Sequence, residues 1–352
     1  MRRIAVCCAL IWAGILPLYA QQPASPSVAP SVSQIPAGVE ARLEKLQASL
    51  GAAQVSGDRK AQAITLTRIA TVHSDLGEKQ KALDFDNQAL SIYRALGDRD
   101  GEANTLNYTG MVYSDLGERQ KALELYNQAL PLFRAAGDSR SQADTLSNIG
   151  AVYSDLGETE KALDFLNQAL PLHRAAGNRS GEAATLDTIG AVYSALGQQQ
   201  KALDSYNQAL LIYRALGDRD DEAMTLNNIG EAYFQLGELQ KALALYNQAV
   251  PIKHAMGDRD GEAVILANLG EVYSDLGDKQ KALDLYNQAL PLFRVVGDSS
   301  GEATTLNNLA EVYSGLGENR KALDVYNQAL PLHRAVGNRS GEAITLNNIG
   351  AA

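Results

Sequence analysis

Apolar residues recur at spacings of three and four along most of the chain, which is the pattern of helices that bury one face. Leu226, Ile229 and Tyr233 mark one such helix, and a second apolar face follows it. Gly237 stands between the two as a helix stop. Asp258 stands where a side chain would cap the next first helix. The pattern therefore predicts an all-helical chain built from antiparallel helix pairs.

The helix pair repeats with a period of 40 residues and without insertion. Three sets of positions carry the period: a leucine in each first helix, a glycine after it, and a glycine after each second helix. They are Leu66, Leu106, Leu146, Leu186, Leu226, Leu266, Leu306 and Leu346; Gly77, Gly117, Gly157, Gly197, Gly237, Gly277 and Gly317; and Gly97, Gly137, Gly177, Gly217, Gly257, Gly297 and Gly337. Neither helix can bury its apolar stripe alone, so stacked units are expected to share one continuous core.

The period also predicts how the chain is divided. Residues 57–336 hold seven units, and residues 37–56 align with a second helix, so we expect them to cap the N-terminal end. Residues 337–352 begin an eighth unit, whose second helix is missing, which suggests a fragment of a longer product. The alternative is a frayed last helix that docks on the seventh unit. Several second helices contain an interior proline, where we expect a bend with the helix continuing to its glycine.

The first 36 residues differ from the repeats. "MRR" is basic, residues 4–18 are apolar, and "LYA" precedes "QQ", so residues 1–20 read as a secretory signal peptide cut after Ala20. A retained membrane anchor is the minority reading, because the apolar stretch is short for a span. Cleavage would remove two of the 31 basic residues and none of the 41 acidic ones, taking the net charge from −10 to −12. Residues 21–36, rich in Pro, Ser and Ala, are expected to form a disordered linker.

One unit carries a recognisable pattern of small and large residues. Its members are Leu146, Ile149, Gly150, Tyr153, Ala162, Leu166 and Ala169. This pattern resembles the tetratricopeptide repeat, in the long form seen in kinesin light chain and in Pins-type scaffold proteins, and the resemblance covers about residues 57 to 352. It implies a right-handed superhelical solenoid of stacked helix pairs whose first helices line a concave groove. In two units an alanine, Ala70 or Ala310, stands at the position of Gly150, so this position requires a small residue.

Catalytic and metal-binding chemistry is not indicated. Catalysis needs unlike groups that converge on one point, and the four histidines are scattered. His173 and His333 stand where Phe133 and Tyr213 stand in other units, so they are interpreted as packing variants. No spacing of histidines or cysteines suits a metal, and no glycine-rich loop follows a strand. We expect no enzyme activity, no cofactor and no metal.

The candidate binding residues lie on the face of the first helices opposite the buried stripe. Asparagine amides there could pair with the backbone of an extended peptide, as the resemblance also implies, and the acids would favour a Lys- or Arg-bearing segment. The candidates are Asn107, Asn148, Asn227, Asn228, Asn268, Asn307, Asn308, Glu231, Glu271 and Glu311. The alternatives stay open that the asparagines bond neighbouring helices or water, and that the acids form a solvated face.

Two functions are compatible with these features. The first is an exported, periplasmic or extracellular scaffold that binds extended protein segments and is not catalytic. The second is the recognition arm of a larger enzyme, because the repeat resembles bacterial arrays often followed by a caspase-like CHAT peptidase domain. The acidic balance speaks against nucleic acid and anionic membranes as partners. Self-association through the open C-terminal end is a further expectation.

Overall fold

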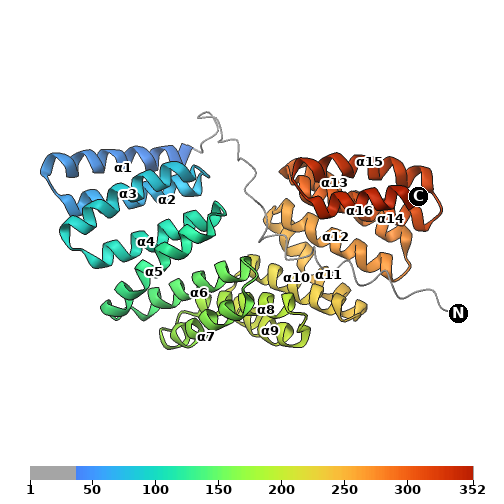
Figure 1. The fold of residues 1–352 in the computed structure, drawn as a ribbon, viewed down its shortest axis with the longest axis horizontal. Coiled ribbons are helices and arrows are strands. Elements are labelled where there is room, and N and C mark those ends of the chain that lie inside the picture. The colour runs from blue at the N-terminus through green and yellow to red at the C-terminus, as the bar shows by residue number, and fades with distance from the viewer. Residues whose placement is uncertain (1–36, 352) are drawn as a thin grey trace. The chain divides into compact units, whose positions relative to one another are not determined.

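The structure is a computed structural model that describes residues 37–351, and within this range it is almost wholly α-helical and contains no strand (Figure 1). The predicted all-α fold is confirmed. The predicted signal peptide (residues 1–20) and linker (residues 21–36) lie outside the described residues.

The helices alternate between the two kinds that the sequence predicts. A leading helix, α1 (Ala37–Ser56), precedes them. The first helices are α2 (Arg59–Asp75), α4 (Arg99–Asp115), α6 (Ser139–Asp155), α8 (Arg179–Ala195), α10 (Arg219–Gln235), α12 (Arg259–Asp275), α14 (Ser299–Gly315) and α16 (Arg339–Ala351). The second helices are α3 (Lys79–Leu96), α5 (Arg119–Ala136), α7 (Thr159–Ala175), α9 (Gln199–Leu216), α11 (Leu239–Met256), α13 (Lys279–Val296) and α15 (Asn319–Ala335).

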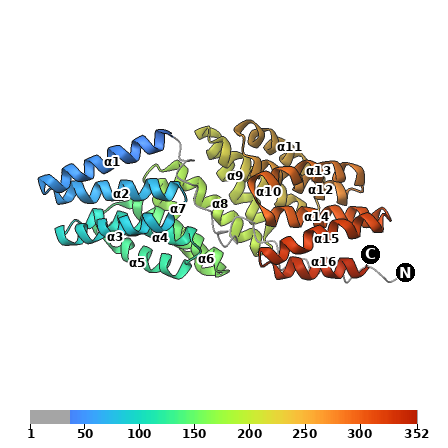
Figure 2. The same ribbon diagram turned by 90° about the horizontal axis from the view of Figure 1, so that it is seen from above.

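The described chain divides into two compact units, residues 37–188 and 189–351, with the boundary inside α8. Within each unit the two helices of a pair pack against each other and against the next pair (Figures 1 and 2). Successive first helices also contact one another, as α2 contacts α4 and α10 contacts α12. The backbones of the second helices lie closest to first helices in the described part of the chain, and second helices meet one another through side chains, as where Arg94 of α3 donates to Gln128 of α5 over 3.4 Å. First helices therefore form one layer of each unit and second helices the other.

Capping residues set the helix bounds. Asp258 Oδ1 accepts a hydrogen bond of 3.0 Å from the Gly261 N–H, as predicted, and an Asp or Asn caps each of the other first helices in the same way. Gly257 ends the preceding helix with φ 71°, a left-handed conformation that costs glycine little. The side chain of Glu238 makes no cap bond to α11 and instead pairs with Lys241.

The interior prolines do not end their helices. Pro131 lies inside α5, which continues to Ala136 as expected, and the equivalent prolines of α7, α11, α13 and α15 behave alike. All five prolines are exposed. The carbonyl that loses its N–H partner is therefore on the wet side of the helix, where water can replace the bond, and the cost of proline falls.

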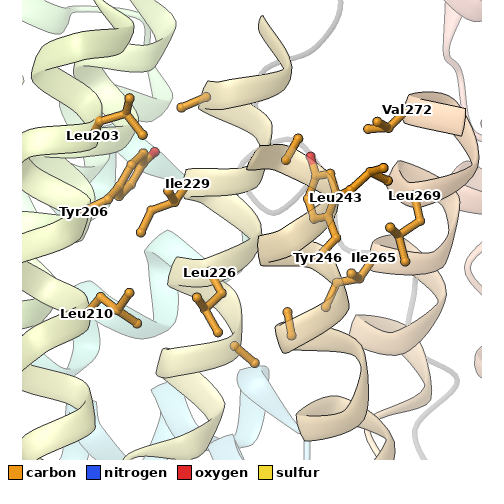
Figure 3. Close-up of a cluster of buried hydrophobic side chains, with 14 of the residues drawn as sticks. Leu203, Tyr206, Leu210, Leu226, Ile229, Leu243, Tyr246, Ile265, Leu269 and Val272 are labelled. Carbon is orange, nitrogen blue, oxygen red and sulfur yellow. The ribbon is translucent and has the colours of Figure 1, made fainter. Parts of the chain in front are cut away.

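The core is made by the apolar stripes of both kinds of helix. Figure 3 shows one cluster that runs through α9, α10, α11 and α12, in which Tyr206 and Tyr246 alternate with aliphatic side chains. Gly230 lies against the ring of Tyr246, and Gly150 lies against Leu166. Neither glycine has a positive φ, so the prediction that this position needs small volume is confirmed.

Candidate functional site

His173 is the centre of a polar network in the first unit that superficially resembles a catalytic triad. Its Nε2 lies 3.2 Å from Ser147 Oγ, and its Nδ1 lies 3.8 Å from Asp144 Oδ1. Asn178 Oδ1 accepts from the Gly181 N–H, so Asn178 Nδ2 donates to His173 Nδ1 over 3.1 Å. His173 therefore carries its proton on Nε2 and donates it to Ser147, which is the opposite of what a general base does.

Burial explains the rest of this network. His173 is 1% exposed, and burial lowers its pKa, so the imidazole is neutral. His333 is equally buried and lies 3.0 Å from Asn307. The prediction that both histidines are packing variants is confirmed, and neither is placed for chemistry.

The lysines in the first turn of the second helices contact acids and tyrosine rings on the surface. Lys121 pairs with Glu118 and lies over the ring of Tyr113, 5.1 Å from its centroid. The same cation–π contact recurs in each later unit up to Lys321. Lys121, Lys161, Lys241 and Lys321 pair with a glutamate three residues earlier, whereas Lys281 Nζ donates to the hydroxyl of Tyr273 over 2.7 Å.

Three glutamates stand at equivalent places on three adjacent first helices of the second unit. Glu231 lies on α10, Glu271 on α12 and Glu311 on α14, and we call them the glutamate row. α12 contacts both α10 and α14, which brings the three carboxylates into electrostatic range of one another. Glu231 and Glu271 are half-buried and Glu311 is more exposed.

The carboxylates of this row repel one another in a partly desolvated place. Burial, and then the charges of Glu231, Asp275 and Glu311, raise the pKa of Glu271 to about 8. Burial also raises the pKa values of Glu231 and Glu311. No salt bridge joins any of the three to a basic side chain within residues 37–351, although Lys279 is near enough to lower the pKa of Glu311. No basic side chain of the described chain neutralises this row, so part of its negative charge is removed by protonation of Glu271 at neutral pH.

Tyrosine hydroxyls from the second helices lie behind the row. Tyr246 donates a hydrogen bond of 3.3 Å to Glu231 Oε2, and Gln235 Nε2 donates one of 2.7 Å to Glu231 Oε1. Asn348 Nδ2 donates to Glu311 Oε1 over 3.0 Å. Tyr286 is bonded to Asn308, and Glu271 and Glu311 raise its pKa further after burial. These tyrosines were not identified as site residues from the sequence, although their 40-residue recurrence was visible.

The first unit differs from the second at the corresponding surface. Met111 stands at the glutamate position of α4, and in α4 and α6 the acid one turn further on is paired with a basic side chain. Lys79 Nζ lies 2.6 Å from Asp115 Oδ2, and Arg119 Nε lies 3.4 Å from Asp155 Oδ2. For Asp275, the residue that corresponds to Lys79 and Arg119 in the preceding helix pair is Leu239. Asp275 therefore lacks such a bridge in the described chain. A row of glutamates with no salt bridge to a basic side chain in the described chain is therefore found only in residues 189–351.

The candidate asparagines fall into two groups. Asn107, Asn227 and Asn307 stand one residue before the repeat position that Asn148 occupies, and they bond neighbouring first helices. Thr145 Oγ1 donates to Asn107 Oδ1 over 3.0 Å, and Asn268 Nδ2 donates to Asn227 Oδ1 over 2.9 Å. Asn307 is 6% exposed and bonds Thr345 through both its amide oxygen and nitrogen. These amides link one helix to the next.

The other group lies beside the glutamate row. Asn148, Asn228, Asn268 and Asn308 are half-buried, three residues before the glutamate position of their helices. Asn228 and Asn268 therefore adjoin Glu231 and Glu271, whereas Asn148 adjoins Ala151. The structure brings amides and carboxylates together on α10, α12 and α14.

Within residues 37–351, no three His, Cys, Asp or Glu side chains are grouped so that they could hold a metal ion. Among the described helices, none combines the length and apolar character needed to cross a membrane.

Comparison with known proteins agrees with this architecture. The family model described as tetratricopeptide repeat matches residues 62–135, 141–215, 181–255, 221–294, 262–335 and 301–352. The sequence has no significant match among curated proteins.

Solved structures share the fold at low sequence identity. The apo form of the quorum sensor NprR from B. thuringiensis is 17% identical, with 83% of each chain covered and a TM-score of 0.67. The apo form of RapI is 17% identical, with 79% of this chain and 99% of that one covered and a TM-score of 0.65. BtubC from P. vanneervenii is 22% identical, with 62% and 92% covered and a TM-score of 0.56.

Proposed function

The chain belongs to the tetratricopeptide repeat family, and from that premise we propose that it is a protein-binding scaffold for an extended, basic segment. The segment would cross α10, α12 and α14, with its Lys or Arg side chains directed at Glu231, Glu271 and Glu311. The observation that carries the proposal is the glutamate row, in which burial first, and then the charges of Glu231, Asp275 and Glu311, raise the pKa of Glu271 to about 8. A cation between two such carboxylates would relieve that repulsion.

The surface beside the row suggests how the segment is held. On α10 and α12, Met224 and Val264 stand four residues before Asn228 and Asn268. The glutamates Glu231 and Glu271 stand three residues after these asparagines. At about 1.5 Å per helical residue, these rows are about 6 and 4.5 Å apart along the helix axis. A backbone lying over the amide row would place side chains toward the acids on one side and the apolar residues on the other.

The test measures binding of a defined probe. A fluorescein-labelled peptide of alternating lysine and alanine is titrated with the unaltered protein and, separately, with a variant in which Glu231, Glu271 and Glu311 are all replaced by Gln. Losing the contacts of three carboxylates, which a bound cation would hold in their ionised form, is expected to weaken binding about tenfold or more, which corresponds to about 1.4 kcal/mol. Binding to the unaltered protein should also weaken with added salt, because exposed charges are screened.

A matched variant separates the row from the general acidity of the chain. Replacing Glu118, Glu158 and Glu318 by Gln removes the same charge from the second-helix ends, where these acids pair with lysines. That variant should bind like the unaltered protein. Equal losses in the two variants, or equal affinity for a peptide with glutamate in place of lysine, would reject the proposal.

Export is a second part of the proposal and rests on the residues of the N-terminus alone. The basic start, the apolar stretch and Ala20 favour a cleaved secretory signal. N-terminal sequencing of the protein recovered from its native host should begin at Gln21. A mature chain that retains Met1, or one found only in the cytoplasm, would contradict this part without touching the binding proposal.

A further inference from the structure

Asp86 occupies a core position that is apolar or aromatic in the other units. The equivalent residues of the later second helices are Tyr126, Leu166, Tyr206, Tyr246, Tyr286 and Tyr326. Asp86 itself is 0% exposed on α3, which packs against α2 and α4. A carboxyl group in such a place must be paired, or it must lose its charge.

The hydrogen bonds around Asp86 fit the protonated form of its carboxyl group. Asp86 Oδ1 has no hydrogen-bond partner among the described residues. Asp86 Oδ2 lies 3.4 Å from Thr109 Oγ1, but Thr109 already donates its hydroxyl proton to the Thr105 carbonyl over 2.7 Å. A threonine hydroxyl has one proton and two acceptor lone pairs. The contact is therefore best satisfied when Asp86 is the donor and Thr109 the acceptor.

No charge nearby favours an ionised carboxylate. Burial raises the pKa of Asp86 to about 7, and Thr109 is the one side chain that lowers it. No charged or titratable group of α2, α3 or α4 contributes to this pKa. On α2, the ring nitrogen of His73 is bonded to Glu78 and not to Asp86.

We propose that Asp86 is protonated in the folded protein and that its ionisation loosens the packing of α3 against α2 and α4. The hydrophobic clusters on the two sides of this position are separate: one joins Leu43, Ile69 and Val72, and the other joins Leu90 and Leu106. In the second unit, Tyr206 and Tyr246 belong to one cluster that runs through four helices (Figure 3). The packing around Asp86 is thus weaker than at the tyrosine positions, and its stability depends on whether Asp86 is protonated.

The direction of the pH dependence follows from linkage. The folded chain holds the Asp86 proton more tightly than the unfolded chain, whose aspartate has a pKa near 3.9. The stabilising effect is complete below about pH 4 and is lost as the pH rises to about 7, where both states are ionised. The equilibrium constant for opening this region should rise about a thousandfold over that window as an upper limit.

The experiment compares the full chain with Asp86→Asn, which keeps the shape and cannot ionise. Hydrogen exchange of the α3 and α4 amides is measured between pH 4 and pH 8 and corrected for intrinsic rates. Protection in the unaltered protein should fall by at least tenfold between pH 4.5 and pH 7 relative to Asp86→Asn. Superimposable pH dependences would overturn the proposal.

Two further measurements keep the proposal testable if Asp86→Asn does not fold. Asp86→Tyr recreates the Ala310–Tyr326 arrangement beside Ala70, so it should fold and should lack the pH-dependent opening. The unaltered protein should show, by infrared spectroscopy at pH 5.5, a protonated-carboxyl carbonyl band that is absent in Asp86→Tyr. Absence of such a difference band would also overturn the proposal.

Discussion

A Cβ atom on Gly230 would lie 2.6 Å from Cε1 of Tyr246, so the ring of Tyr246 occupies the space that any side chain at Gly230 would need. The same relationship joins Gly110 to Tyr126, Gly190 to Tyr206 and Gly270 to Tyr286. In one unit the chain tolerates alanine, because Ala310 stands opposite Tyr326 and both are buried. A methyl group can therefore be accommodated by a small shift of the helix pair, whereas a larger group cannot.

Substitutions at Gly230 should separate these two cases. Gly230→Ala should change the free energy of unfolding by less than about 1 kcal/mol, because the helix propensity gained by alanine offsets the shift of the ring. Gly230→Leu should lower it by about 3 kcal/mol through overpacking. Urea denaturation followed by circular dichroism measures both, and equal losses would show that the Tyr246 ring does not set the limit.

Gly257 should be sensitive to substitution for a different reason. It has φ 71° with open space around it, so Gly257→Ala should cost about 1 kcal/mol through backbone strain alone. Gly51 lies inside α1 with no atom in the way and no positive φ, so Gly51→Ala should stabilise the protein by about 0.5 kcal/mol. Thermal melting of the two variants should shift in opposite directions; shifts of the same sign would contradict this account.

Much of the fold could be read from the sequence because its determinants are local. Asp258 caps α12 and Gly257 ends α11 where the pattern placed them, since caps and stops depend on residues within one turn. The sequence also predicts that the second helices continue past their interior prolines, and they do. The close approach at Gly230 was also predictable, because alanine was the one substitute that the period showed.

The candidate site was only partly predictable because it depends on contacts between units. The spacing within a helix placed Glu231, Glu271 and Glu311 on one face, but it could not show that Arg119 neutralises Asp155 from the preceding pair. Nor could it show that Asn307 turns toward Thr345, since neighbouring asparagines look alike in sequence. Asp86 departs from the period in the sequence itself, but its missing hydrogen-bond partner is visible only in three dimensions.

Glu271→Gln should stabilise the protein at alkaline pH. Burial and the neighbouring acids raise the pKa of Glu271 to about 8, above that of an unfolded glutamate, so stability is lost as the pH rises from about 4.5 to about 8. The amide avoids this loss, and after allowance for screening the gain at pH 8.5 should be about 1 kcal/mol. Urea denaturation at pH 5 and pH 8.5 should show the gain only at the higher value, with Glu118→Gln as an unaffected control.

Lys253 offers a test of whether a buried ion pair or an aromatic ring suits the same place better. Its side chain is 4% exposed and its Nζ lies 2.5 Å from Asp220 Oδ1 and 2.8 Å from Asp258 Oδ2, where Phe133 and Phe293 stand in other units. Lys253→Ala should lower the free energy of unfolding by about 3 kcal/mol, because it leaves a cavity and two acids without their partner. Lys253→Phe should come within about 1 kcal/mol of the unaltered protein or exceed it, because packing replaces a costly desolvation and both aspartates keep access to water. Urea denaturation of the three proteins at neutral pH decides the matter; a loss in Lys253→Phe as large as in Lys253→Ala would mean that the charge, and not the volume, is what this position requires.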